Sequence, residues 1–260
     1  MRFSTFKERW HSVLASILGK IPGITRLYYR LFYSPTPNTT SFKINESARQ
    51  ISDFTFLQIG GNDGFINDPI FKLIKKYNWS GVIVEPQTWV FNNRLKRTYL
   101  NDSRVKLEHV AIDKEPGTKK LYKLSITDAR WATGLATFDR ETLVNQIERN
   151  YVDRRASRDG LSTPSNTDDY IVHEEVACTT ITHLLKKHKF EKLDLLQIDT
   201  EGYDFEIIKT IDFDFIKPRI VCFEMMHLSD SDKQACEALF EQHGYRFEAI
   251  NSDGIAVLHE

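Results

Sequence analysis

Residues 54–64 read FTFLQIGGNDG, a short apolar run that ends in a cluster of glycines. The run has the length of a buried β-strand, and the glycines mark a turn into the next segment. Glycine is required where the backbone takes a positive φ angle or approaches a ligand closely, and free N–H groups in such a turn can bind a carboxylate or a phosphate. The stretch therefore predicts the first strand of an α/β sheet, with a ligand-binding turn at its carboxyl end.

Helix and strand patterns alternate along the rest of the chain. The first four segments after the glycine turn are a helix at residues 69–77, a strand at 81–85, a helix at 88–100 and a strand at 105–112. The chain closes with YRFEAI, NSDG and IAVLH, which predict a β-hairpin around an Asp-Gly turn. We expect a mostly parallel sheet with helices on both faces and an antiparallel hairpin at its end.

The second predicted strand ends in Glu85 and Pro86, which follow the buried run VIV. An acid at this place in a Rossmann-like sheet can accept hydrogen bonds from both hydroxyls of a ribose. The dinucleotide pattern GxGxxG does not fit, because Ile59 stands where its first glycine is needed. The alternative is that Glu85 is an ordinary surface carboxylate.

Two later strands also end in polar residues, within LQIDTEGYD (residues 196–204) and FEMMH (residues 223–227). We expect Asp199 and Glu201 to face the crevice at the carboxyl ends of the strands, although Asp199 could instead cap the next helix. Glu224 and His227 are suitable acceptors for a hydroxyl proton, while a lone histidine is more often structural. No metal site is predicted; a divalent cation held by these carboxylates and His227 is the weaker alternative.

The blocks FLQIGGNDGF, VIVEP, LLQIDTEGYDFEII and IVCFEMMHL resemble the FkbM family of S-adenosylmethionine-dependent methyltransferases, over about residues 52–258. The resemblance implies a Rossmann-like class I fold with a seven-stranded sheet. It also implies O-methylation of a hydroxyl group, on a sugar, a glycan or a related natural product. Gln58 departs from the pattern, since many members have an acid there, but its amide can still hydrogen-bond the amino group of the methyl donor.

The resemblance also assigns roles to residues of this chain. Those implied to bind S-adenosylmethionine are Gln58, Gly60, Gly61, Asp63, Gly64, Glu85, Pro86, Asp199 and Glu201. Those proposed for the chemistry are Asp199, Glu224 and His227.

Composition narrows the class of protein. Thirty-five basic and 36 acidic residues give a net charge of −1, so we expect no nucleic-acid partner. Three cysteines without CxxC spacing indicate reduced thiols in a cytoplasmic protein.

The chain divides into three parts by composition. Residues 1–33 form a basic amphipathic helical arm, residues 34–51 a linker, and residues 52–260 the methyltransferase domain, with a substrate or lid insertion at about 125–175. Two interpretations of the arm remain open: it contacts an anionic membrane peripherally, or it packs on the core of the domain.

Two other functions remain as alternatives. One is a nicotinamide or nucleotide-sugar enzyme on a Rossmann sheet, against which the missing GxGxxG and the terminal hairpin count. The other is a non-catalytic subunit that binds the donor without turnover. The sequence leaves the acceptor and the oligomeric state open.

Overall fold

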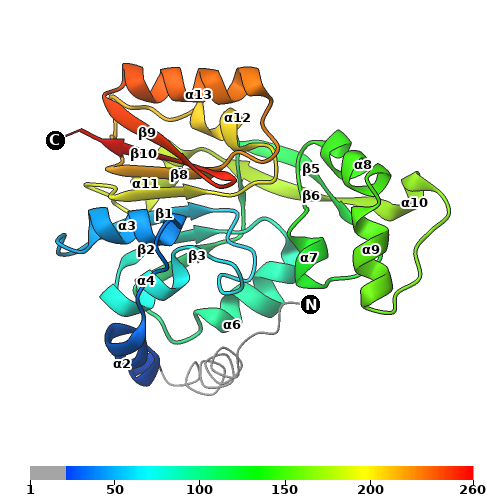
Figure 1. Ribbon diagram of the computed structural model, residues 1–260, viewed down its shortest axis with the longest axis horizontal. Helices are drawn as coiled ribbons and strands as arrows, with labels where there is room; N and C mark the ends of the chain where they lie inside the picture. The colour runs from blue at the N-terminus through cyan, green and yellow to red at the C-terminus, as the bar shows by residue number, and fades with distance from the viewer. Residues whose placement is uncertain (1–21, 260) are drawn as a thin grey trace.

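The computed structural model describes residues 22–259, so most of the predicted N-terminal arm lies outside the described residues. Seven strands form the main sheet in the order β3-β2-β1-β7-β8-β10-β9 (Figure 1). Strand β10 runs antiparallel to both of its neighbours, β8 and β9, and the other pairs of neighbouring strands in this sheet are parallel. This arrangement confirms the predicted class I methyltransferase fold. The strands are β1 (Thr55–Ile59), β2 (Ser80–Val84), β3 (Val105–Glu108), β7 (Leu195–Ile198), β8 (Ile220–Glu224), β9 (Tyr245–Ile250) and β10 (Asp253–Leu258).

Helices cover both faces of this sheet, because the central strands are apolar on both sides. In β1, Leu57 and Ile59 join one hydrophobic cluster while Phe56 joins another. The first cluster includes residues of α11 (Ile181–Lys187), α12 (Asp204–Ile208) and α13 (Asp230–Gln242). The second includes residues of α2 (Pro22–Phe32), α3 (Thr40–Ala48), α4 (Phe71–Tyr77) and η1 (Phe91–Leu95), a π-helical turn between α5 (Thr88–Val90) and α6 (Lys96–Thr98).

The segment predicted as a linker, residues 34–51, contains the helix α3. Thr39 caps its first turn by accepting a hydrogen bond from the backbone N–H of Phe42, at 3.2 Å. Ile44 is fully buried in the core. The segment is thus part of the domain, and the linker prediction was wrong over residues 40–48.

The turn of the C-terminal hairpin differs from the predicted Asp-Gly turn. Ile250 pairs with Asp253, so the two residues of the turn are Asn251 and Ser252. Asn251 takes the left-handed conformation, with φ of 56°, which asparagine tolerates better than most residues. Gly254 is therefore a strand residue, and a Cβ at this position would lie 2.7 Å from the ring of Phe223.

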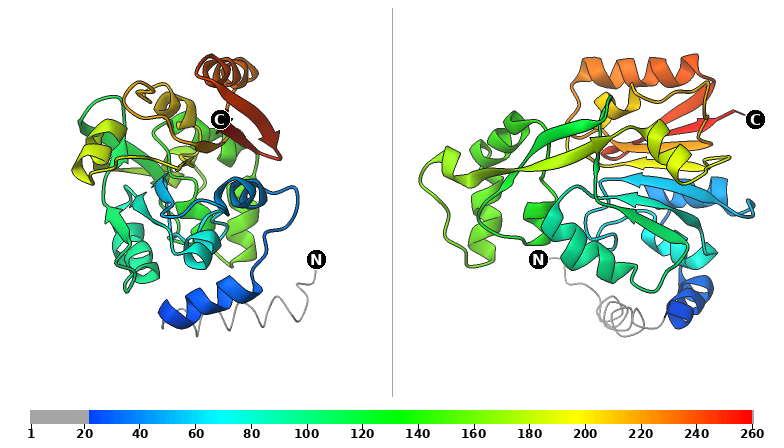
Figure 2. Two further views of the ribbon diagram at one scale, coloured as in Figure 1. Left: turned by 90° about the vertical axis from the view of Figure 1, so that its left-hand side faces the viewer. Right: turned by 180° about the vertical axis from the view of Figure 1, so that it is seen from behind.

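A second, smaller sheet carries the predicted insertion. Its order is β4-β6-β5, and the antiparallel pair β5–β6 extends away from the main sheet toward four short helices (Figures 1 and 2). The elements are β4 (Ala111–Ile112), β5 (Gly117–Leu124), β6 (Ile171–Thr179), α7 (Arg130–Thr133), α8 (Arg140–Glu148), α9 (Tyr151–Arg158) and α10 (Thr167–Tyr170). The predicted insertion is therefore folded, with a hydrophobic cluster of its own around Leu143 and Val152.

Among residues 22–259, no helix combines the length and the apolar character needed to cross a membrane.

Candidate active site

A pocket lies where β1, β2 and β7 end, between the main sheet and the insertion. Its volume is about 620 Å³, open space at its mouth included. The main sheet and its loops contribute Ile59, Gly60, Asn62, Val84, Glu85, Pro86, Gln87, Asp199, Thr200, Glu201, Tyr203 and Ile207. The insertion and β4 contribute Ala111, Ile112, Leu121, Arg130, Thr133, Gly134, Ala136, Thr137 and Phe138.

The glycine turn after β1 is shaped by the neighbouring strands. Gly60 has a φ of +80°, and a Cβ there would lie 1.8 Å from the backbone oxygen of Asp199. The N–H groups of Gly60 and Gly61 both donate to the carbonyl oxygen of Val84, at 3.0 and 2.9 Å. Gly60 is therefore needed because the ends of β1 and β7 pack backbone to backbone, and the turn is pinned to the end of β2.

Glu85 lies at the centre of this arrangement. Its Oε2 accepts a hydrogen bond from the N–H of Asn62 and its Oε1 one from the N–H of Gln87, both at 2.8 Å. Burial raises the pKa of this carboxyl to about 7, although the two backbone hydrogen bonds favour its charged form. The side chain is only 2% exposed and lines the pocket. Glu85 is therefore not the ordinary surface carboxylate of the alternative interpretation.

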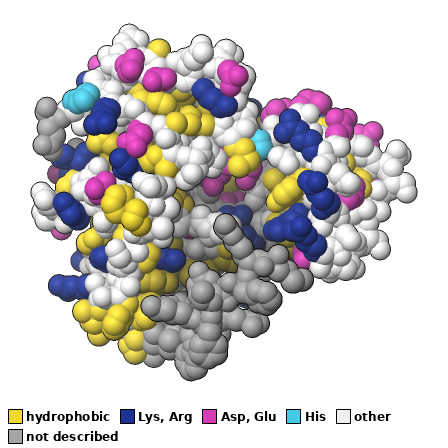
Figure 3. Space-filling view, viewed as in Figure 1, with side chains coloured by type: hydrophobic (Ala, Val, Ile, Leu, Met, Phe, Trp, Pro, Cys, Tyr) yellow, Lys and Arg dark blue, Asp and Glu magenta, His cyan; other side chains and the backbone are white. Residues whose placement is uncertain are grey.

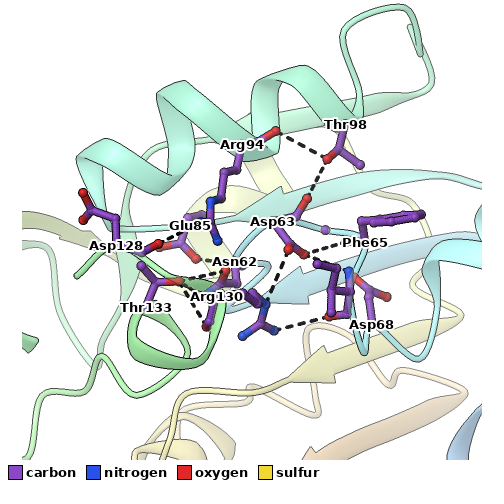
Figure 4. A network of polar contacts seen from close by, with 12 residues as sticks. Asn62, Asp63, Phe65, Asp68, Glu85, Arg94, Thr98, Asp128, Arg130 and Thr133 are labelled. Atoms are coloured by element: carbon purple, nitrogen blue, oxygen red, sulfur yellow. Dashed lines mark hydrogen bonds and ion pairs between the residues drawn. The ribbon is translucent and has the colours of Figure 1, made fainter. Parts of the chain in front are cut away.

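Arg130 closes one side of the pocket from the insertion. Its Nε lies 3.6 Å from Oδ2 of Asp63, as Figure 4 shows. The Oδ1 of Asp63 accepts hydrogen bonds from the N–H groups of Phe65 and Ile66. Asp63 does not itself line the pocket; it holds the glycine turn together and positions a cation beside the pocket.

Thr133 connects the two parts of the pocket wall. Its carbonyl oxygen accepts a hydrogen bond from Nε2 of Gln87, at 2.9 Å. Its hydroxyl lies 3.4 Å from the side-chain amide of Asn62 (Figure 4). The insertion is thus fastened to the glycine turn and to the end of β2.

Carboxylates gather at the ends of β7 and β8. Asp199 and Glu201 line the pocket, and Glu201 takes the left-handed conformation, with φ of 52°. Burial raises the pKa of Asp199 well above its usual range, and the charges of Glu201 and Asp204 raise it further. Asp204 is fully buried and accepts hydrogen bonds from the hydroxyl and the N–H of Thr200, while Asp199 does not cap α12, whose N-cap residue is Tyr203.

His227 and Glu224 lie behind Glu201. Nε2 of His227 is 3.2 Å from Oε2 of Glu201 and 3.9 Å from Oε2 of Glu224. The hydrogen bond to Glu201 raises the pKa of His227 despite its burial. Burial and the charge of Glu201 raise the pKa of Glu224 to about 9, and Oε2 of Glu224 has no hydrogen-bond partner among the described residues.

The same three side chains could hold a cation, since one ligand atom of each of Glu201, Glu224 and His227 lies within 4.8 Å of the others. Carboxylate and imidazole are ordinary ligands of divalent metals. Glu201 and His227 already form a hydrogen bond with each other, so these two side chains can also act as an acid–base pair without a cation.

The structure thus separates the residues singled out from the sequence. Gly60, Glu85, Pro86, Asp199 and Glu201 line the pocket. Glu224 and His227 do not line the pocket; His227 contacts Glu201, and Glu224 lies beside His227.

The remaining sequence-predicted residues have other surroundings. The side chain of Gln58 donates to Asp68, while its Oε1 is buried without a hydrogen-bond partner among the described residues. Gly61 and Gly64 face packed side chains. A Cβ on Gly61 would lie 2.2 Å from the side chain of Ile83, and a Cβ on Gly64 would lie 2.7 Å from the ring of Tyr99.

Sequence reasoning missed several residues of the wall, notably Asn62, Gln87, Arg130 and Thr133. Asn62 and Gln87 lie next to the motifs that were recognised, so their position was a usable signal. Arg130 and Thr133 come from a short helix in the insertion, where no local pattern indicates a contact with the glycine turn.

The model of the family described as "Methyltransferase FkbM domain" matches residues 58–247, a range that includes every residue lining the pocket. No curated protein matches the chain.

Three solved structures to which the chain is similar are distant from it in sequence. A methyltransferase FkbM from Methylobacillus flagellatus KT is 10% identical, with 89% of this chain and 50% of that chain covered and a TM-score of 0.43. A precorrin-6y C5,15-methyltransferase from Geobacter metallireducens GS-15 is 11% identical, with 88% and 94% covered and a TM-score of 0.41. An SAH-bound methyltransferase from Podospora anserina is 11% identical, with both chains fully covered (100%) and a TM-score of 0.43.

Proposed function

The chain belongs to the FkbM methyltransferase family, whose methyl donor is S-adenosylmethionine, and we propose that it methylates a hydroxyl group of a sugar, a glycan or a related natural product. The observation that carries the proposal is the position of the pocket. It has Glu85 at the end of β2 and Asp199 and Glu201 after the end of β7, and Glu201 contacts His227, which lies outside the pocket wall. One end suits the donor and the other suits proton transfer.

The pocket residues fit this donor chemically. Each oxygen of Glu85 has accepted one backbone hydrogen bond, and a carboxylate oxygen can accept a second, so two ribose hydroxyls can still bind there. Asp199 lines the pocket, where burial and the neighbouring charges of Glu201 and Asp204 raise its pKa and disfavour its charged form. A donor that carries a sulfonium and an ammonium group supplies positive charge that favours the charged form.

The residues of the chain then have separate tasks. Bound S-adenosylmethionine supplies an activated methyl group, which needs an aligned oxygen more than a strong base. Asp199 and Glu201 line the pocket, so the hydroxyl proton passes to Asp199 or through Glu201 to His227, and Glu201 orients the imidazole and stabilises its charged form. Glu224, with a pKa of about 9, is protonated at neutral pH and lies beside His227.

Aromatic side chains of the pocket wall support an acceptor with an apolar face. Phe138 and Tyr203 line the pocket, with ring centroids 5.2 Å apart. Trp131 does not line the pocket: its Nε1 donates to Asp159, and Arg155 lies 5.8 Å from its ring. We therefore assign contact with a sugar ring to Phe138 and Tyr203.

We also propose that the protein acts in the cytoplasm. Cys178, Cys222 and Cys236 are free and buried, as is usual for proteins of reducing compartments.

The test begins with calorimetric titration of the donor. We expect S-adenosylmethionine to bind, and Glu85→Ala to weaken binding about tenfold to a hundredfold, because two hydrogen bonds to a charged group are lost. Glu206→Ala is the matched control, since that side chain is exposed and, among residues 22–259, forms an ion pair only with Lys209. No donor binding to folded protein would refute the proposal.

The second step is transfer of a labelled methyl group to a panel of sugars and glycans. The carbon chemical shift of the product separates O-methylation from N- or C-methylation. His227→Ala should slow transfer about a hundredfold or more with little change in donor affinity. Donor binding without transfer to any acceptor would instead favour the non-catalytic subunit.

A further inference from the structure

The two faces of α2 have opposite environments. On the inner face Tyr29 is buried against Phe71, with ring centroids 6.0 Å apart, and Arg26 forms an ion pair with Asp102 at 2.9 Å. The outer face carries four exposed apolar side chains at helical spacing: Ile24 (42% exposed), Leu27 (56%), Leu31 (63%) and Phe32 (69%). The helix is therefore held firmly by one face while it presents a row of large apolar groups on the other.

The elements next to α2 are strongly basic. α2 and α4 contain five Lys and Arg residues and no acid, and residues 94–106 add five more with one acid, Asp102. Asp102 is already paired with Arg26 and Lys75. Since the whole chain has a net charge of −1, these segments carry an excess of positive charge that the rest of the chain offsets.

Exposed apolar side chains and basic side chains occur together at α2. Leu100, in the basic segment, is 76% exposed and lies close in sequence to Asp102, the partner of Arg26. Figure 3 shows hydrophobic side chains gathered at the lower left, where α2 lies, with Lys and Arg side chains beside them. The preceding residues 1–21 add four Lys and Arg and one Glu to the sequence that leads into α2.

We propose that the outer face of α2, together with Leu100, docks on an anionic lipid bilayer. Apolar side chains enter the boundary between headgroups and acyl chains, while the surrounding cations are attracted to anionic headgroups. Each of the two features needs the other, because neither scattered cations nor a few exposed leucines bind a membrane strongly alone.

Two other occupants fit less well. A second copy of the chain would bring two strongly positive surfaces together, which Coulomb repulsion disfavours. A nucleic acid would use the cations but leave the apolar side chains of α2 in water.

The experiment is sedimentation of the full chain with vesicles of phosphatidylcholine alone and of phosphatidylcholine mixed with phosphatidylglycerol. We expect binding to the anionic vesicles only, and weaker binding as salt is added. The double substitution Leu27→Ser and Leu31→Ser should weaken this binding at least about tenfold, since two leucines that would be buried in the bilayer are lost. Phe215→Ser is the matched control, an exposed aromatic (42%) in the loop between α12 and β8, and should leave binding unchanged.

Three outcomes would overturn the proposal: no binding to anionic vesicles, binding that the double substitution leaves intact, or a dimer in light scattering that this substitution dissociates. Thermal melting checks that both variants fold. Titration with S-adenosylmethionine in the absence of vesicles should give the same affinity for both, so this proposal and the methyltransferase proposal fail separately.

Discussion

At the residue scale, Glu85 determines how the pocket responds to pH. Its carboxylate is shielded from solvent but bonded to the backbone N–H groups of Asn62 and Gln87. Burial disfavours the charge and the hydrogen bonds favour it, and the pKa of about 7 is the result. A ligand that donates further hydrogen bonds to this carboxylate will therefore bind best to its ionised form.

Donor affinity should consequently fall as the pH falls. Between about pH 8 and about pH 6 the ionised share of a group with a pKa near 7 drops roughly tenfold, and affinity should drop by up to the same factor. Glu85→Gln should bind more weakly at the higher pH and lose this part of the pH dependence. Calorimetric titration at both pH values checks this. The amino group of the ligand titrates equally with both proteins, so an unchanged slope in the variant would contradict the role of Glu85.

Gly60 should be among the least replaceable residues of the chain. Gly60→Ala places a methyl group 1.8 Å from the backbone oxygen of Asp199 at a φ of +80°, and should destabilise the fold by about 3 kcal/mol or more. Gly160→Ala is the control, since its φ is +70° but no atom lies within 4 Å of the Cβ position; it should cost only about 1 kcal/mol. Urea denaturation measures both. Equal losses would show that backbone conformation, and not strand packing, requires the glycine.

These glycines also show where prediction from sequence stops. The glycine motif of residues 58–64 could be recognised from the sequence. The sequence does not show whether a given glycine is required by a neighbouring part of the protein or by a ligand, because the residue is the same in both cases. Gly61 and Gly64 are required by neighbouring side chains, because Ile83 of β2 and Tyr99 fill the space beside them. The acids at strand ends were easier to place, since a parallel sheet brings the carboxyl ends of its strands together.

At the element scale, a buried ion pair connects α2 and α4 to the loop before β3. Asp102 bonds Nζ of Lys75 at 2.8 Å, and the Lys75 side chain is only 8% exposed. Burial acts to raise the pKa of Asp102, but Lys75 and Arg26 outweigh it and the pKa is lowered. The stabilisation from Asp102 is therefore present above its unfolded pKa and is lost as the pH falls toward its folded pKa.

Asp102→Ala should destabilise the protein by about 3 to 5 kcal/mol, because it leaves Lys75 buried without its partner. Combining it with Lys75→Met should restore most of the loss, as the buried charge is then removed as well. Chemical denaturation at neutral pH gives both values. A double variant no more stable than Asp102→Ala alone would show that the unpaired charge of Lys75 is not the cause.

The error at this scale concerned α3. The prolines, serines and threonines of residues 34–41 are typical of a linker, and the helix after them has only nine residues. Its few apolar positions give no clear period, and Ile44 becomes a core residue only because β1 and the C-terminal strands lie beneath it. Tertiary packing, which local composition does not report, decided the outcome.

At the scale of the whole molecule, the pocket belongs to two parts that are far apart in sequence. The glycine turn and the end of β2 provide one wall, and residues 130–138 provide the other. The alternation of strands and helices predicted the first part. It did not predict the second, because the insertion is anchored by the two-residue strand β4 and by side-chain contacts to Asn62 and Gln87.

A ligand in this pocket should therefore order both parts at once. We expect saturating S-adenosylhomocysteine to slow amide hydrogen exchange in residues 60–64 and also in α7, while α9, which does not line the pocket, keeps its rate. Gln87→Ala removes the bond to the carbonyl oxygen of Thr133 and should weaken the protection of α7 more than that of the glycine turn. Exchange measured by mass spectrometry distinguishes the cases. Protection confined to residues 60–64 would mean that the donor is bound by the main sheet alone, and that the insertion serves only the acceptor.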